Sequence, residues 1–126
     1  MNLFESAKDF RKLFQVSDVI SKKNVDKQFK LITEEVTELC EAHGRMVGSG
    51  FQPVFVADFL KESCDVIYVI AQYAAFLNID IDEAYRRVHE NNMAKVGPDG
   101  RPVFREDGKV LKPVGHPPVN LIDLVD

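Results

Sequence analysis

The chain has 126 residues, 45% of them apolar, which fits one domain able to build a core. The net charge of −4, with acidic and basic residues intermixed, argues against general nucleic-acid binding, which favours a basic surface. No apolar run approaches the roughly 20 residues of a membrane span, and early charges (Glu5, Lys8 and Asp9) argue against a secretory signal. Two cysteines are too few for a disulfide framework, so we expect reduced thiols in a cytoplasm.

Four segments have the apolar periodicity of helices, and we therefore predict an all-α fold. Glycines provide the stop signals, at Gly48 and Gly50 after the second segment and at Gly97 after the fourth. The predicted helices run from about Leu3 to Phe14, from about Val25 to Val47, from about Val56 to Leu77 and from about Asp82 to Val96.

The last thirty residues differ in character, since they hold four of the seven glycines and five of the six prolines. Asp107-Gly108 lies between two short apolar stretches, 103–104 and 110–111, which is typical of a small hairpin. The tail is too apolar in places to be plain disorder, so we expect it to pack on the helices or on a neighbouring subunit. We predict a helical core over residues 1–96 and an extended or hairpin tail over residues 97–126.

Carboxylates fall on the apolar faces of the second and third helices. Glu35 lies inside the apolar stripe of the second helix, with Glu38 at its edge. Glu62 lies inside the stripe of the third helix, with Asp65 at its edge. Because a spacing of three places two side chains on one helix face, each pair points in one direction.

Burial of an ionised carboxylate without a partner is unfavourable by roughly several kcal/mol or more. If the two helices face each other, four carboxylates meet, and no lysine or arginine lies in either stripe to neutralise them. A divalent metal is the natural solution, with two or more ions per site. All-oxygen ligation favours magnesium or manganese over zinc, and the lack of Glu-x-x-His pairs argues against a di-iron bundle.

A single acidic pair of this spacing is usually a solvated helix face. Two pairs, both within apolar stripes, make the metal site the better interpretation. Asp58, one turn before Glu62 on the same face, is either a further member of the site or an exposed residue near the start of its helix.

The pattern Glu34-Glu35-x-x-Glu38, followed by Glu62-x-x-Asp65, resembles the signature of the MazG-like all-α nucleotide pyrophosphatases. The segments 92–95, 99–102, 105–112 and 117–118 are similar to the tail of short, single-domain members. Many of those are phage-encoded, including the ones called MazZ, or phosphoribosyl-ATP pyrophosphohydrolase-like. The resemblance covers about residues 25–121. It implies a helical bundle completed by dimerisation, often onward to a tetramer, and a host cytoplasm if the chain is phage-encoded.

The resemblance also implies roles for the acidic residues. Glu35, Glu38, Glu62 and Asp65 would be the metal ligands. Glu34, which with Glu35 and Glu38 makes up the expected catalytic group, would orient the attacking water or touch an additional ion.

Substrate contacts follow from the resemblance at four positions and from local sequence at a fifth. Asn92 and Lys95 would face the nucleotide sugar and phosphates, with Lys109 and Lys112 as outer phosphate contacts. Gln28, at the start of the second helix, is a candidate neighbour of the base, although a core or surface role is an equal alternative.

The third predicted helix is apolar over most of its circumference, and a helix of this kind is buried on all sides. One small subunit cannot easily do this, so we expect an obligate homo-oligomer, a dimer or a dimer of dimers. No nucleic-acid or membrane partner is expected.

The leading hypothesis is metal-dependent hydrolysis of a (deoxy)nucleoside triphosphate to the monophosphate and pyrophosphate. The resemblance to phage members makes the purine deoxynucleotides dGTP and dATP the preferred substrates. Two alternatives stay open: a phosphoribosyl-ATP pyrophosphohydrolase, and a helical nucleotide-sensing or dimerisation module with a structural metal site.

Overall fold

The computed structural model describes residues 1–125 and confirms the all-α fold. Every α-helix end lies within three residues of its predicted position. None of the helices within residues 1–125 has the length and apolar character needed to cross a bilayer. The elements are α1 (Leu3–Leu13), α2 (Lys22–Gly48), α3 (Pro53–Phe76), α4 (Ile81–Met93) and the short 3-10 helix η1 (Ile122–Leu124).

Local signals explain where the first three helices begin. The side chain of Asn2 accepts a hydrogen bond from the backbone N–H of Glu5 at 2.8 Å and so caps α1. Ser21 caps α2 in the same way, by accepting from the backbone N–H of Asn24 at 3.2 Å. α3 begins at Pro53, which lacks an N–H and has a φ suited to a first helical turn.

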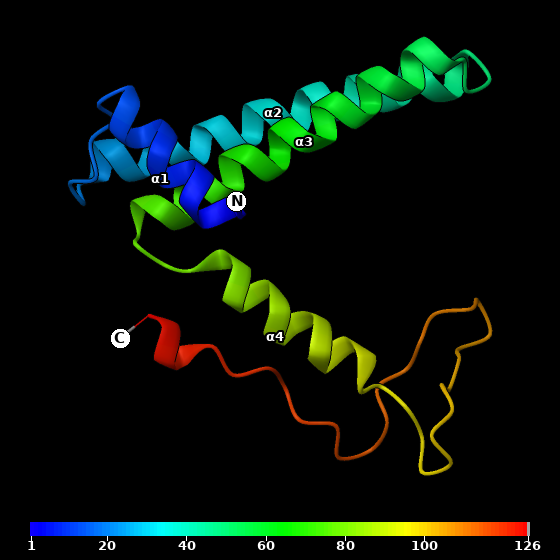
Figure 1. Cartoon of the computed structure of the whole chain (residues 1–126). Helices are drawn as coiled ribbons and strands as arrows, with labels where there is room; N and C mark the ends of the chain where they lie inside the picture. Colours follow the sequence, from blue (N-terminus) through cyan, green and yellow to red (C-terminus); the bar gives the residue numbers. More distant parts are fainter. Residues whose placement is uncertain (126) are drawn as a thin grey trace. The chain divides into compact units, whose positions relative to one another are not determined.

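The same three helices end in one common motif. The second residue beyond each helix is left-handed, at Gln15, Gly50 and Asn78, with φ of 55°, 69° and 57°. The next backbone N–H donates to a carbonyl five residues earlier, as from Phe51 to Met46 at 2.9 Å. This ending turns the chain sharply after α2, so that α3 returns alongside α2 in the opposite direction (Figure 1).

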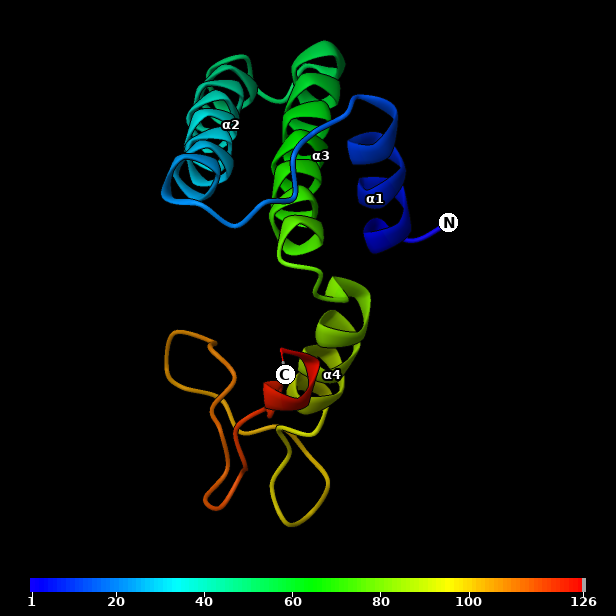
Figure 2. The same ribbon diagram turned by 90° about the vertical axis from the view of Figure 1, so that its left-hand side faces the viewer.

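α3 packs against both α1 and α2 and lies between them (Figure 2). Ala7 of α1 and Ala71 and Ala75 of α3 form a buried cluster, and these small side chains allow the two helices to approach closely. Many large apolar side chains of α3 remain exposed, among them Leu60 and Ile67. The core of this unit is therefore small for its apolar content.

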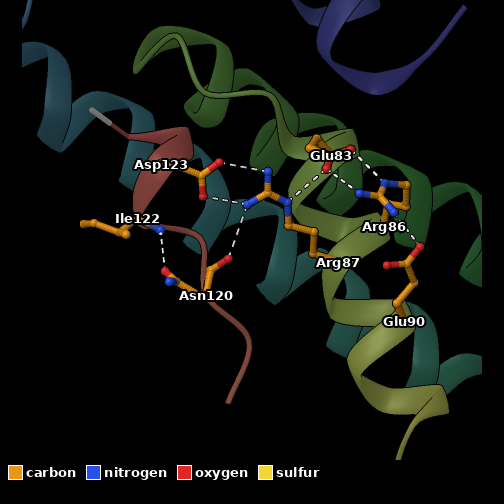
Figure 3. Close-up of polar contacts among 7 residues, drawn as sticks. All are labelled: Glu83, Arg86, Arg87, Glu90, Asn120, Ile122 and Asp123. Carbon is orange, nitrogen blue, oxygen red and sulfur yellow. Dashed lines mark hydrogen bonds and ion pairs between the residues drawn. The ribbon is translucent and has the colours of Figure 1, made fainter. Parts of the chain in front are cut away.

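Residues from 82 onward form a second compact unit, distinct from Met1–Ile81. Within it, the guanidinium of Arg87 donates to both oxygens of Asp123 at 2.7 and 2.9 Å, and to Glu83 at 2.9 Å (Figure 3). Asn91 donates to the carbonyl of Pro117 at 2.9 Å. These contacts join the end of the tail to α4. Packing of the tail on the other helices or on a neighbouring subunit, and a domain division at residue 97, stay predictions.

The tail makes local backbone contacts around Asp107-Gly108, where a hairpin was predicted. One antiparallel bridge joins Phe104 and Val110, and the backbone N–H of Leu111 donates to Val103 at 2.8 Å. Gly108, with φ of 88°, supplies the left-handed residue of the turn.

Candidate metal centre

Four carboxylates from α2 and α3 come together, and they are the four predicted from the sequence. One oxygen from each of Glu35, Glu38, Glu62 and Asp65 lies within 4.8 Å of the other three. Each helix contributes a pair three residues apart, on one face. Because α2 and α3 are antiparallel neighbours, the two pairs meet across their interface (Figure 1).

Two oxygens of this cluster have no hydrogen-bond partner among the described residues. Oε2 of Glu35 and Oε2 of Glu62 are both buried and unpaired within residues 1–125. The side chain of Glu62 is only 12% exposed. A buried acceptor without a donor is strongly unfavourable, more so when it is charged. A positively charged group placed between these carboxylates would therefore stabilise the cluster.

The pKa of Glu35 reflects the same crowding of carboxylates. Burial raises the pKa of the Glu35 carboxyl above its ordinary value, and a hydrogen bond with Glu38 raises it further. Repulsion from Glu38, Asp65 and Glu62 adds to the rise in this pKa. Each of these causes disfavours the ionised form in the free protein, and a cation bound at the cluster would oppose all of them.

The donor set fits a divalent cation of the magnesium type. All four groups that could hold a cation are carboxylates, which Mg²⁺ and Mn²⁺ prefer. Two oxygens bound to one Mg²⁺ at about 2.1 Å are at most about 4.2 Å apart. The observed spread of 4.8 Å therefore needs a contraction of less than about 1 Å, within the reach of rotamer adjustments.

The sequence argument missed one cation, Lys61. Its Nζ lies 2.6 Å from Oδ2 of Asp65 and 3.4 Å from Oε1 of Glu62. The sequence argument considered only lysines and arginines within the apolar stripes, and Lys61 pairs with two of the carboxylates from outside them. Lys61 lies outside the apolar stripe of α3, but its long side chain reaches the residue four positions later, a spacing that could have suggested the contact.

Two further acidic residues lie outside the four-carboxylate cluster. Asp58 pairs with Arg45 at 2.8 Å, so a neighbouring arginine satisfies it. Glu34 is exposed and lies 3.9 Å from Lys30 on its own helix. A part for Glu34 in catalysis stays a prediction, and its exposure leaves it free to turn.

Gln28 is buried rather than on the surface, since only 4% of the residue is exposed. Its side-chain Oε1 is buried and has no partner within residues 1–125. Gln28 lines two cavities near the start of α2, of about 320 and 260 Å³. A buried amide with an unused acceptor beside a cavity is consistent with a ligand contact.

The remaining predicted substrate contacts belong to the second unit. Asn92 is exposed near the end of α4, and Lys95 is half-buried just beyond it. Lys109 and Lys112 are exposed in the tail, and Lys112 lines a cavity of about 340 Å³ with Leu111 and neighbouring tail residues. Their relation to the carboxylate cluster stays a prediction.

Comparison with known proteins assigns the chain to a family. No curated protein matched the sequence. The model of the phosphoribosyl-ATP pyrophosphohydrolase family matches residues 7–92, which include all four clustered carboxylates and helices α2 and α3 in full. The match covers more than half of the chain and agrees with an all-helical fold that carries an acidic cluster able to bind metal. The chain belongs to the phosphoribosyl-ATP pyrophosphohydrolase family, and is a pyrophosphohydrolase of the MazG-like superfamily.

Proposed function

We propose that the protein hydrolyses a (deoxy)nucleoside triphosphate, with purine deoxynucleotides preferred, to the monophosphate and pyrophosphate in a Mg²⁺- or Mn²⁺-dependent reaction. One observation carries the metal dependence: two buried, unpaired carboxylate oxygens, on Glu35 and Glu62, within a four-carboxylate cluster. The purine preference rests on the resemblance of the tail segments to short phage-type members.

The residues divide the work according to their positions. Glu35, Glu38, Glu62 and Asp65 would hold the cations, which when bound supply charge neutralisation at the phosphates and lower the pKa of a bound water. Glu34, which is exposed and precedes Glu35 in the sequence, would orient the attacking water by accepting its hydrogen bond. Phosphoryl transfer depends mainly on positioning and charge neutralisation, which suits a site built from carboxylates and lysines.

Positive side chains would hold the outer phosphates. We assign this role to Lys95, Lys109 and Lys112, with Asn92 at the sugar. The exposure of the two tail lysines leaves them free to contact a substrate. With the phosphates held beyond the scissile bond, water attacks the α-phosphorus and pyrophosphate leaves intact.

The working form would be a homo-oligomer, a dimer or a dimer of dimers. An apolar groove of about 450 Å³ lies between α2 and α3, and Phe29, Ile32, Ile70 and Tyr73 contribute to its walls. Ile70 is 40% exposed and Phe29 is 58% exposed. Exposed apolar surface of this extent is typical of an association surface.

The family match favours phosphoribosyl-ATP as a second candidate substrate, because that reaction gives the family its description. Hydrolysis of phosphoribosyl-ATP breaks the same kind of phosphoanhydride bond and gives the four carboxylates the same role. The two candidates differ in what the base carries, since phosphoribosyl-ATP bears a second ribose phosphate.

A substrate panel tests the proposal. The protein is incubated with Mg²⁺ and the four deoxynucleoside triphosphates, the four ribonucleoside triphosphates or phosphoribosyl-ATP, and the products are separated by chromatography. We expect pyrophosphate and the monophosphate, fastest from dGTP or dATP. Turnover of phosphoribosyl-ATP alone would replace this substrate assignment with the second candidate. Equal turnover in Mg²⁺ and in excess chelator would contradict the proposed role of the cluster.

A further inference from the structure

Two buried glutamines line the same cavity, and they differ in how their side-chain amides are satisfied. Gln72 of α3 accepts from the guanidinium of Arg11 at 3.4 Å and donates to the carbonyl of Ala7 at 3.5 Å. Gln28 of α2 accepts no hydrogen bond at Oε1 within residues 1–125. Both residues are at least 95% buried. Gln72 therefore holds the helices together, whereas Gln28 has an unused hydrogen-bonding group.

The cavity beside Gln28 suits a flat, mostly apolar ligand. It measures about 260 Å³, and Leu31 and Val69 contribute apolar walls. Phe10 and Tyr68 also line it, with ring centroids 5.6 Å apart in an edge-to-face arrangement. Aromatic side chains of this kind are the usual stacking partners of nucleobases.

The position of the cavity relates it to the carboxylate cluster. Leu31 lies four residues before Glu35 on α2, and Val69 lies four residues after Asp65 on α3. Each is one helical turn from the cluster, and both offsets run toward the same end of the antiparallel pair (Figure 2). Gln28 lies seven residues before Glu35, which is about 10.5 Å along the helix. In a nucleotide bound at the cluster by its phosphates, the sugar lies between those phosphates and the base. A base that extends toward this end of the two helices therefore lies on the side of the cavity.

We infer that this cavity holds the nucleobase of the substrate, and that Gln28 determines specificity by hydrogen bonding to the base edge. The inference rests on the proposed nucleotide function and adds the residue that distinguishes one base from another. A carboxamide pairs with a base edge that presents a donor and an acceptor side by side. A half-turn of the last Gln28 torsion exchanges its oxygen and nitrogen, so the group can meet an exocyclic amino group or a ring N–H.

The ligand chemistry required is therefore a planar heterocycle with an N–H donor on its edge. Adenine and cytosine carry this donor as an amino group, thymine carries it on a ring nitrogen, and guanine carries both. A bound base would donate a hydrogen bond to Oε1 of Gln28 and at the same time pack against the apolar walls of the cavity. Water could satisfy the oxygen, but it would leave the walls wet.

The test is equilibrium binding of the four deoxynucleoside monophosphates in Mg²⁺ by calorimetry, with inorganic pyrophosphate as the probe that has no base. Wild type is compared with Gln28→Met, which keeps the volume but removes both hydrogen-bonding ends. We expect wild type to distinguish the strongest from the weakest base by about tenfold or more. The variant should lose that ratio, bind pyrophosphate as wild type does, and unfold at a higher temperature, because a buried unpaired acceptor has been removed.

Two controls keep the inference falsifiable. Gln28→Glu retains the shape and the acceptor and loses the N–H, so its ratios among the four bases should change even if Gln28→Met fails to fold. Wild-type base ratios in a folded Gln28 variant, or no base discrimination by wild type, would overturn the inference. Monophosphates contain no bond to be cleaved, so a Gln28-dependent ratio without triphosphate hydrolysis would retain the base cavity and refute the proposed reaction.

Discussion

The ammonium group of Lys61 lies 2.6 Å from Oδ2 of Asp65, a member of the carboxylate cluster, and 3.4 Å from Oε1 of Glu62. The same two residues raise the pKa of Lys61, chiefly through the hydrogen bond to Asp65. Lys61 therefore interacts with two of the carboxylates that would hold a metal ion. It partly neutralises the cluster from the solvent side, where its side chain is 65% exposed.

Removal of this lysine should strengthen metal binding. In Lys61→Gln, a cation no longer competes for Asp65, and the apparent affinity for Mn²⁺ should rise by up to about fivefold, since exposed ion pairs contribute about 0.2–1 kcal/mol. Titration followed by calorimetry measures the change. Lys23→Gln on α2, which lies outside the cluster contacts, is the matched control. A fall in Mn²⁺ affinity in Lys61→Gln would show that Lys61 helps to assemble the site.

Neutralisation of any clustered carboxylate should separate activity from stability. Glu35→Gln, Glu38→Gln, Glu62→Gln and Asp65→Asn should each lower kcat/KM by about 100-fold or more, because metal-assisted charge stabilisation supplies several kcal/mol. The metal-free variants should unfold at the same or a higher temperature than wild type, since repulsion is relieved. Asp58→Asn is the matched control, because Asp58 pairs with Arg45 and lies outside the cluster. An equal loss of activity in Asp58→Asn would remove the special status of the four.

Acid should loosen the second unit over a defined pH range. Hydrogen bonds from Arg86 and then Arg87 lower the pKa of Glu83 from 4.5 to about 2, and the bond from Arg87 lowers the pKa of Asp123 (Figure 3). A lowered folded-state pKa gives stability that is present above the unfolded value and is lost as the pH falls toward the folded value. Because intrinsic amide exchange slows in acid, the quantity to follow is the protection factor, which should fall in α4 and the tail between pH 4.5 and about 2. Glu83→Gln should have lower protection factors already at pH 7, and these should depend less on pH, whereas an unchanged acid response would contradict the assignment.

Association should depend on the apolar groove between α2 and α3. Ile70→Glu places a charge in that groove and should yield monomers by light scattering at low micromolar concentration, where we expect wild type to be a dimer or larger. Val114→Glu, on a fully exposed tail residue, should leave the assembly unchanged. A monomeric wild type would refute the proposed oligomer, and an oligomeric Ile70→Glu would move the association surface elsewhere.

The sequence sufficed to predict the helices and the carboxylate cluster because both depend on short-range periodicity. The glycine stop near Gly50 and the three-residue spacing of Glu62 and Asp65 are both local signals. Lys61 escaped prediction because a long side chain outside an apolar stripe can still reach into it.

The setting of Gln28 could not be predicted from its own segment. Its burial and its cavity depend on α1 and on the far end of α3, which contribute Phe10 and Gln72 to the walls. Turn chemistry predicted a hairpin near Gly108, and within residues 1–125 the chain forms one isolated antiparallel bridge there, between Phe104 and Val110.

The most direct test of the central claim is the destination of oxygen from water. Hydrolysis of the preferred triphosphate is carried out in ¹⁸O-labelled water with Mg²⁺, and mass spectrometry measures the ¹⁸O content of each product. Attack at the α-phosphorus, assisted by the cluster of Glu35, Glu38, Glu62 and Asp65, predicts the label in the nucleoside monophosphate, unlabelled pyrophosphate, and a loss of product in Glu62→Gln. Label in pyrophosphate, orthophosphate as the first product, or an undiminished rate in Glu62→Gln would contradict it.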